Sequence, residues 1–362
     1  MILTVIISFF ILIGLIILHE FGHFILAKKF GVKVEEFGIG YPPRIWGKKI
    51  GETLYSLNFL PFGAFVKIYG HEERIQDARS YASKPIWQRF LIILGGVISF
   101  WIVAFVLLTA VIILGMPTVI EDSQNQNIID PKVQILYISQ DSPAFEAGLE
   151  IGDIVTKIKP QGLEPIGIDK VKEIQDITED NKGKEIVLTI KRGKEILDIP
   201  VVPRVSPPDK EGPMGVGLVR TALVSSPLYQ APFKGLAATG DLTLTILKGW
   251  WFTLSSLLGG EGMPEGVEVR GVVGIFELFV QAEGLGLIYF LQFIAIISIS
   301  LAILNIMPIP ALDGGWAVLL ILEKIKGRPI SQKIEQNINS FFFILLISLM
   351  VWITIKDIAR LF

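Results

Sequence analysis

An HExxH motif, formed by His19, Glu20 and His23, lies within an almost unbroken apolar run from Met1 to Ala27. On a helix, residues four apart share one face, with Cβ atoms roughly 5–6 Å apart, so both imidazoles can reach one metal ion. Two neutral imidazoles suit tetrahedral Zn²⁺, and Glu20 can accept a proton from a water molecule there. Ionisable groups at membrane depth cost about 2.5–3.5 kcal/mol each and seldom persist without a function. The motif therefore favours a zinc peptidase site inside a membrane over a chance match in a buried helix.

The composition is that of a membrane protein with a polar insert. Of the 362 residues, 51% are hydrophobic and only 19% are charged, whereas soluble domains usually carry about 25% charged residues. The net charge of −2 gives no support for nucleic-acid binding. The absence of cysteine excludes disulfides, thiolate ligands and cysteine nucleophiles, so a metal site must use nitrogen and oxygen ligands.

Four apolar runs are long enough to cross a hydrocarbon core of about 30 Å, which takes about 20 helical residues. They cover residues 2–27, 90–114, 285–304 and 341–355. The first has no basic residues before it and no clear cleavage site, so we expect a retained span rather than a signal peptide. A weaker run, 236–258, is interrupted by Asp241 and Lys248 and predicts an amphipathic or interfacial helix.

The distribution of basic residues predicts the orientation. Lysines and arginines gather in the loops 28–88 and 324–333, which the positive-inside rule places in the cytoplasm. The long insert between the second and third runs is then expected outside, together with both termini. Lys356 and Arg360 beyond the last run argue against this, but they are outnumbered.

The insert begins with a β-rich region. Residues 132–203 contain short runs of β-branched residues separated by turn signals, which is typical of a small β-domain with hairpins. Prolines at positions 203, 207, 208 and 213 indicate a linker after it. The predicted parts are an N-terminal membrane part (1–114), the β-domain (132–203), a linker with the amphipathic helix (204–283) and a C-terminal membrane part (284–362).

Two histidines leave a catalytic zinc one protein ligand short. Asp313 follows the third apolar run, and it is the only carboxylate between Glu283 and Glu323. Two prolines break the helix before it, and Gly314 and Gly315 allow close approach of the backbone. Broken backbone at membrane depth is tolerated only where it is buried in protein or lines a cavity. Asp313 is therefore the candidate third ligand, and an ordinary interfacial turn with a solvated aspartate is the alternative.

Together, the HExxH motif at 19–23 and the segment from Asn305 to Gly314 resemble the site-2 protease family, in particular its bacterial regulator-of-sigma-E protease type. The family's pattern is HExxH in the first span and NxxPxPxLDG in the third, and both match in full here. The resemblance covers nearly the whole chain.

The resemblance implies roles for individual residues. His19, His23 and Asp313 would bind zinc, and Glu20 would be the general base. Asn305 and Pro308 would help to hold the substrate segment.

The resemblance also extends to the cytoplasmic loop. The stretch from Leu54 to Gly70 is similar to the family's membrane re-entrant β-hairpin, and the stretch from Phe37 to Gly40 matches its Gly-rich turn. Substrate contacts are expected from the middle of the hairpin, at Phe62, Gly63, Ala64 and Phe65. His71, just beyond the hairpin, is expected to be a solvated loop residue.

The segment from Ser142 to Ile158 resembles a PDZ domain of the bacterial protease type. PDZ domains bind extended segments by adding a strand to an exposed sheet edge, and a plain folding spacer is the alternative. The resemblance implies one extracytoplasmic PDZ domain that admits substrates only after their outer domains have been trimmed.

Three positions depart from the family pattern. Gly96 stands where the second span usually has proline, Ser99 stands where it usually has asparagine, and Val272 stands where proline is preferred. These departures concern the packing around the site and leave the expected ligands and base in place.

The expected molecule is a polytopic α-helical membrane protein with about four spans, a re-entrant β-hairpin and an inserted α+β PDZ domain. It is expected in the inner membrane, with its active site toward the cytoplasm. It would hydrolyse peptide bonds within or near the transmembrane segments of single-span membrane proteins, such as anti-sigma factors or remnant signal peptides. Its partners would be these substrates, the lipid bilayer and an upstream site-1 protease, with no nucleic acid.

Two other classes of function fit parts of the sequence. An inactive membrane scaffold could present partners on its PDZ domain, although the intact HExxH motif and Asp313 argue against it. A metal or ion transporter could use the same histidines, but it would carry polar residues along two or more spans, and here they cluster at one depth.

Overall fold

The computed structural model describes residues 2–71, 73, 75–123, 128–193, 195–208, 211–260, 262–264 and 270–360. The chain divides into two compact units. The helical unit comprises the residues up to Leu108, Phe233–Glu283 and the residues from Phe290 onward. The sheet unit comprises Thr109–Pro232 and Gly284–Tyr289.

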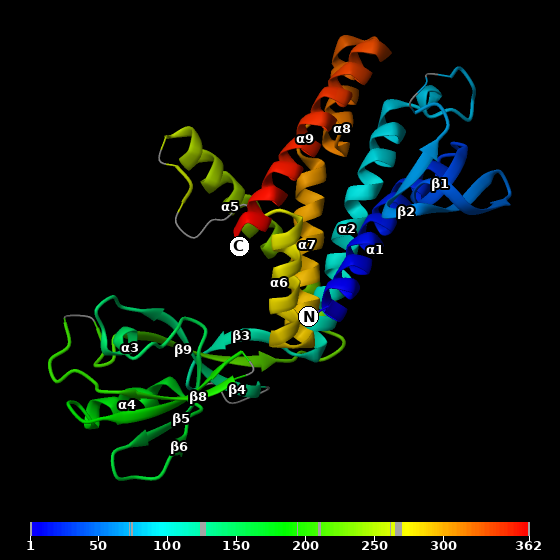
Figure 1. Cartoon of the computed structure of the whole chain (residues 1–362). Coiled ribbons are helices and arrows are strands. Elements are labelled where there is room, and N and C mark those ends of the chain that lie inside the picture. The colour runs from blue at the N-terminus through cyan, green and yellow to red at the C-terminus, as the bar shows by residue number, and fades with distance from the viewer. Residues whose placement is uncertain are drawn as a thin grey trace. The chain divides into compact units, whose positions relative to one another are not determined.

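The helices of the chain are shown in Figure 1. Within the described residues, four of them are long and apolar enough to cross a membrane, which confirms the four predicted spans. They are α1 (Ile2–Lys29), α2 (Ile86–Leu114), α7 (Leu287–Ile306) and α9 (Gln332–Arg360). The helix is the form in which such apolar segments satisfy all of their backbone hydrogen bonds in lipid.

Three further α-helices of the described residues lie in the helical unit. The predicted amphipathic run lies in α5 (Ala231–Leu258), which α6 (Val272–Leu285) follows. The prolines at positions 308 and 310 separate α7 from α8 (Asp313–Lys326), as expected of residues that cannot continue a helix. Asp313 is therefore the first residue of a helix rather than part of an extended turn.

A long antiparallel hairpin, formed by β1 (Val34–Ile50) and β2 (Thr53–Ile68), packs against α1 (Figure 1). Each strand bends, so that the hairpin folds back on itself and forms a small sheet. Across this sheet the strand segments follow in the order 44–50, 53–58, 34–39 and 64–68. In the described part of the chain, the two outer segments each pair on one side only.

The predicted hairpin, Leu54 to Gly70, is one half of this structure. The stretch from Phe37 to Gly40, expected to form a turn, lies within β1. A Cβ atom on Gly38 would lie 2.3 Å from the ring of Phe65. The glycine therefore allows two strand segments to pack closely, which a sequence pattern cannot distinguish from a turn.

The sheet unit is built on an antiparallel sheet with the strand order β3-β9-β4-β5-β7-β8, and β6 pairs with β5. Two short helices, α3 (Pro143–Glu146) and α4 (Val171–Asp180), accompany the sheet. The strands are β3 (Met116–Ile120), β4 (Ile128–Ile138), β5 (Ile154–Pro160), β6 (Ile166–Gly167), β7 (Ile186–Arg192), β8 (Glu195–Val201) and β9 (Val216–Val224).

The sheet extends beyond the predicted domain, 132–203, on both sides. β3 precedes this range, and β9 lies within the stretch predicted to be a linker. Yet β9 pairs with both β3 and β4, so it is an inner strand of the sheet. The prolines before β9 indicated an end to the domain, whereas they belong to a connection within it.

Two apolar clusters of the helical unit surround the HExxH segment of α1. One contains Ala27 and Val34 with residues of α2 and α8. The other contains Leu15 with residues of α2, α6 and α7. Packing at both ends therefore fixes the position of the segment between Leu15 and Ala27.

Candidate metal centre

His19 and His23 lie one turn apart on α1, and both are buried. Their ring centroids are 4.7 Å apart. The ring of His19 stacks on Phe100 of α2, with the centroids 4.7 Å apart. His23 Nδ1 donates a hydrogen bond to the backbone carbonyl of Ile92 at 2.8 Å. Because a carbonyl only accepts, this bond places the proton of the neutral His23 ring on Nδ1 and leaves a lone pair on Nε2.

Asp313 joins the two histidines from the first turn of α8. Its Oδ2 lies 3.2 Å from His19 Nε2 and 3.4 Å from His23 Nε2. One ligand atom from each residue lies within 4.8 Å of the others. The structure thus brings together the two predicted histidines and the predicted carboxylate.

Gly314 and Gly315 make this approach possible. A Cβ atom at 314 would lie 2.1 Å from the carbonyl oxygen of Met307, and one at 315 would lie 2.4 Å from that of Ile309. The tight turn before α8 also places Ala311 at a φ of 73°. Asn339 of α9 accepts a hydrogen bond from the Ala311 amide at 3.1 Å.

The donor atoms fit a zinc ion. The Nε2 atoms of His19 and His23 lie 3.2 Å apart, and both point toward Asp313 Oδ2. In the described residues this oxygen is buried and accepts no hydrogen bond. Lone pairs gathered in this way repel one another unless a cation lies among them. Two imidazole nitrogens and one carboxylate oxygen form a ligand set that catalytic zinc uses, with a fourth position left for water or substrate.

Close packing of α1 on α2 positions this ligand set. A Cβ atom on Gly22 would lie 2.1 Å from the carbonyl oxygen of Gly95, so the two helices cross at these glycines. A Cβ atom on Gly96 would lie 2.3 Å from His23 Nε2 and 2.6 Å from His19 Cε1. Gly96, which departs from the family pattern, therefore packs directly against the candidate ligands. Ser99, another departure, donates a hydrogen bond to the Gly95 carbonyl at 3.0 Å.

Glu20 lies beside the ligands on α1, close enough for Coulombic interaction with His19, His23 and Asp313. Its carboxylate also lies near the backbone amide of Val66. Val66 belongs to segment 64–68, an outer strand of the hairpin sheet. The expected base thus lies between the candidate ligands and a strand segment whose outer edge has no paired strand in the described part of the chain.

The residues expected to hold substrate are placed less closely together. Asn305 lies on α7, where its side-chain amide donates to the Leu301 carbonyl at 2.9 Å, and Pro308 is exposed in the turn that follows. On β2, the ring of Phe62 packs edge-on against Phe9 of α1. The other hairpin residues are Gly63 at a φ of 92°, the buried Ala64, and Phe65, which stacks on Tyr41.

Several residues around the site are not predictable from the sequence. Phe100 and Ile92 contact the histidines from α2, and nothing in their types marks them within an apolar run. His71, expected to be solvated, packs against Tyr81 and Trp316, with ring centroids 4.8 and 4.7 Å away. Burial lowers the pKa of His71 to about 4, so it is a neutral, packed ring. Trp316 lies one turn after Asp313 on α8, and no signal in the sequence pairs it with His71.

Comparison with known proteins places the chain in a family. The sequence pattern of peptidase family M50 matches residues 7–349. A putative zinc metalloprotease of Clostridium perfringens is 33% identical over 348 residues, which cover 95% of each chain. The regulator of sigma-W protease RasP of Bacillus subtilis is 27% identical, with both chains covered in full. The regulator of sigma E protease of Haemophilus influenzae is 27% identical over 98% of each chain.

A solved structure matches part of the chain. The PDZ domain of an SdrC-like protein from Listeria monocytogenes matches 24% of this chain and 85% of that one, at 24% identity and a TM-score of 0.20. At this TM-score the likeness assigns neither a ligand nor a function. The match of the family over nearly the whole length, together with four apolar helices, is decisive. The chain belongs to peptidase family M50, whose members are zinc-dependent metalloproteases, and it is a multi-pass membrane protein of that family.

Proposed function

We propose that the chain is an intramembrane zinc metalloprotease in which His19, His23 and Asp313 hold the metal and Glu20 is the general base. The observation that carries this proposal is the convergence of three ligand atoms from α1 and α8 within 4.8 Å. Because the histidines lie in an apolar helix long enough to span a membrane, the substrate bonds lie within or near transmembrane segments.

The chemistry follows from the placement of these side chains. A zinc ion held here supplies the Lewis acidity that activates water and polarises the scissile carbonyl. Glu20 takes a proton from the attacking water and passes it to the leaving amine. The hydrogen bond from His23 Nδ1 to the Ile92 carbonyl keeps Nε2 directed at the site, and Phe100 holds the ring of His19 in place.

The substrate is presented as a strand. A peptide bond in a membrane helix is shielded, so cleavage requires local unwinding, and each backbone group left unpaired in lipid costs several kcal/mol. The unpaired edge of segment 64–68 can satisfy these groups by strand addition. Because Val66 of this segment lies near Glu20, a strand added there passes close to the base.

Further contacts to the substrate come from the hairpin and from the region around the end of α7. Phe62 and the neighbouring residues Gly63, Ala64 and Phe65 supply the hairpin side. Asn305 lies in the last turn of α7 and Pro308 follows that helix, before α8 begins at Asp313, and these two residues supply further contacts. In this structure the side-chain amide of Asn305 donates to the Leu301 carbonyl of its own helix, and a substrate backbone carbonyl would take the place of that acceptor.

The sheet unit acts as a PDZ domain that gates the admission of substrate. A groove of about 430 Å³ lies between α4 and the start of β9, and Ile174, Thr178, Met214 and Leu218 line it. Among the described residues, β9 pairs with β3 only from Arg220 onward, so that residues 216–219 form an open strand edge along the groove. An extended segment of a partner can add there as a further strand.

The gate can be tested by filling the groove. Gln175 is exposed and lines it, whereas its exposed neighbour Asp176 does not. We expect Gln175→Trp to change the cleavage of full-length substrate relative to substrate without its outer domain, and Asp176→Trp to leave that ratio unchanged. Equal ratios for both variants and the wild type would argue for a folding spacer.

The names of two relatives, regulator of sigma-W protease and regulator of sigma E protease, suggest the substrate class. We propose single-span anti-sigma factors or remnant signal peptides as substrates, with an upstream site-1 protease acting first. The basic loops at 28–88 and 324–333 support a cytoplasmic position for the hairpin in the inner membrane, with the sheet unit outside.

The central experiment measures zinc content and cleavage on the detergent-solubilised chain with a synthetic transmembrane substrate. Glu20→Gln is expected to keep zinc and lose turnover, because it removes only the base. Asp313→Ala is expected to lose both. A wild-type chain that neither binds zinc nor cleaves would favour the inactive scaffold, and full activity of Glu20→Gln would refute the assigned base.

A further inference from the structure

A buried ion pair joins α2 to α8 beside the candidate metal centre. Arg89 of α2 donates to the two carboxylate oxygens of Glu323 in α8, at 2.8 and 3.4 Å. Only 9% of the Arg89 side chain and 15% of the Glu323 side chain are exposed. Burying two charges costs several kcal/mol per ion before their mutual attraction is counted. Such a pair is weak evidence for stability, so its geometry needs another explanation.

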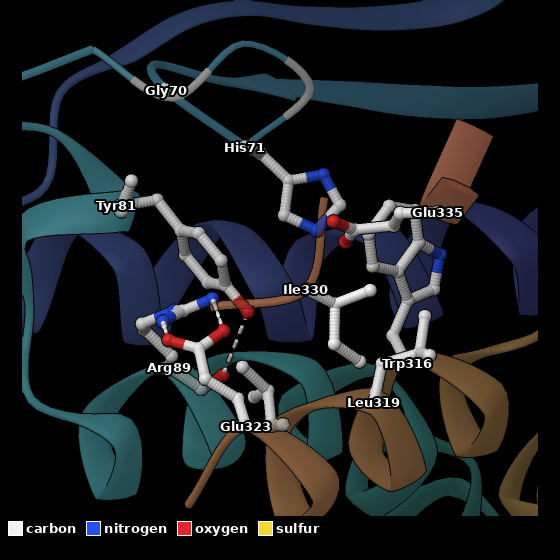
Figure 2. Close-up of a pocket in the computed structure, with 11 residues that line it drawn as sticks. Gly70, His71, Tyr81, Arg89, Trp316, Leu319, Glu323, Ile330 and Glu335 are labelled. Atoms are coloured by element: carbon white, nitrogen blue, oxygen red, sulfur yellow. Dashed lines mark hydrogen bonds and ion pairs between the residues drawn. The ribbon is translucent and has the colours of Figure 1, made fainter. Parts of the chain in front are cut away.

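The ring of Tyr81 lies beside the pair, and the rings of His71 and Trp316 lie farther from it, as Figure 2 shows. The Arg89 guanidinium lies 5.1 Å from the centroid of the Tyr81 ring, and the Tyr81 hydroxyl donates to the Arg89 carbonyl at 3.4 Å. His71 lies between Tyr81 and Trp316. The cavity among these residues has a volume of about 10 Å³, at the lower limit for a single water molecule. Among the described residues this region is therefore closely packed.

Both ends of the pair are connected to the candidate ligands through one helix each. Arg89 lies one turn before Ile92, whose carbonyl accepts the hydrogen bond from His23. Glu323 lies on the helix that begins with Asp313. Between these points, Ile92 of α2 and Ala317 and Leu320 of α8 belong to one buried cluster. A shift of α8 along α2 would thus move Asp313 relative to His23.

We infer that Arg89 and Glu323 are positioning residues that set the register of α8 against α2 and so fix Asp313 at the metal. Apolar contacts between helices are non-directional and allow sliding. A guanidinium bound to both oxygens of a carboxylate is directional, because its donors have a fixed planar geometry. This inference rests on the proposed zinc site at His19, His23 and Asp313.

The test measures zinc affinity by competition with a chelator, together with kcat, KM and the thermal midpoint of the metal-free chain. The variants are Arg89→Gln, Glu323→Gln and Arg89→Lys. Arg204→Gln is the matched control, because Arg204 pairs with Glu211 in the sheet unit at 3.4 Å. We expect the two glutamine variants to bind zinc about 10–100-fold more weakly, the range typical of residues that orient ligands.

The pattern across the measurements separates positioning from general stability. At saturating zinc, kcat should fall while KM changes by less than about twofold, because the substrate edge at 64–68 is untouched. Arg89→Lys keeps the charge but not the paired donors, so its zinc affinity should lie between those of Arg89→Gln and the wild type. Arg204→Gln should match the wild type in zinc affinity and kcat.

A double variant controls for loss of folding, because each single variant removes one member of a buried ion pair. Arg89→Met combined with Glu323→Leu buries no charge, and it should keep the thermal midpoint while binding zinc more weakly. Wild-type zinc affinity in this double variant and in Glu323→Gln would overturn the inference. That result is distinct from failure of the zinc site itself, in which Asp313→Ala would bind zinc as well as the wild type.

Discussion

Gly96 is the residue that most directly limits what the metal centre can tolerate. A methyl group there would lie 2.3 Å from His23 Nε2 and 2.6 Å from His19 Cε1, well inside van der Waals contact. By contrast, a Cβ atom added to Gly14 of α1 would have no neighbouring atom within 4 Å. The side chain missing at 96 thus leaves the space that both imidazoles occupy.

We expect Gly96→Ala to weaken zinc binding at least about tenfold, because the rings must turn away from Asp313. Gly14→Ala is the control, since it adds the same methyl group to open space and improves helix propensity. Zinc content after dialysis against a weak chelator distinguishes the two variants. Equal retention by both would show that α2 can move away from the histidines without loss.

His71 carries a prediction for pH dependence. Burial between Tyr81 and Trp316 lowers its pKa to about 4, whereas the unfolded chain takes up the proton near pH 6.5. The stabilisation that neutral, buried His71 gives the folded state is therefore fully present above pH 6.5. It is lost progressively as the pH falls from about 6.5 to about 4. An imidazole resonance that is absent in His71→Gln should titrate with a midpoint near 4. A midpoint near 6.5 would show that His71 is solvated, as expected from the sequence.

At the scale of elements, a carboxylate of α9 binds the start of α6. Asp357 of α9 is buried, and its Oδ2 accepts hydrogen bonds from the amides of Gly271 and Gly274, at 2.7 and 2.9 Å. These amides lie at the start of α6, where a helix has unpaired donors and favours negative charge. A side chain from another helix thus caps α6.

Removing this cap should loosen the first turn of α6. We expect Asp357→Ala to lower the free energy of local opening there by about 1 kcal/mol, with a smaller loss in Asp357→Asn, which keeps one acceptor oxygen. Hydrogen exchange at residues 271–276 provides the measurement, and Asp241→Ala on α5 is the control. Unchanged exchange in Asp357→Ala would mean that packing alone holds α6 to α9.

The elements also show which features of the structure can be predicted from the sequence. The four spans and the two histidines were predictable, because each depends on periodicity within one segment. Asp313 was predictable because a broken helix with one carboxylate has few roles in lipid. Arg89 and Glu323, by contrast, are 234 residues apart, and neither residue type indicates its partner. Strand β9 was missed for the same reason, since its partners β3 and β4 lie about 80 to 100 residues earlier in the chain.

At the scale of the whole molecule, the division into two compact units predicts separate responses to metal removal. A ligand that binds only the folded state stabilises it by about 2.7 kcal/mol at one hundred times its dissociation constant. All three candidate zinc ligands lie in the helical unit. We expect a chelator to increase hydrogen exchange in α1, α2 and α8 of the wild type and to leave the core strands β5 and β7 unchanged.

The same treatment of Asp313→Ala serves as the control, because this variant has little zinc to lose. Its exchange should resemble that of the chelated wild type before and after the chelator is added. An equal chelator effect on the core strands of the sheet unit would show that the two units unfold together.

If the substrate adds to segment 64–68 as proposed, this edge, which is open in the described residues, has a consequence for the choice of substrate. A strand edge binds the N–H and C=O groups that every polypeptide shares, and so it reads little of the side-chain sequence. Substrates would then differ mainly in the free energy needed to unwind a few residues of the transmembrane helix into an extended strand. Glycine, proline and β-branched residues lower that barrier. A helix-stabilising substitution far from the cut bond should therefore protect a substrate. Selection would then depend more on the local stability of the transmembrane helix than on its amino-acid sequence.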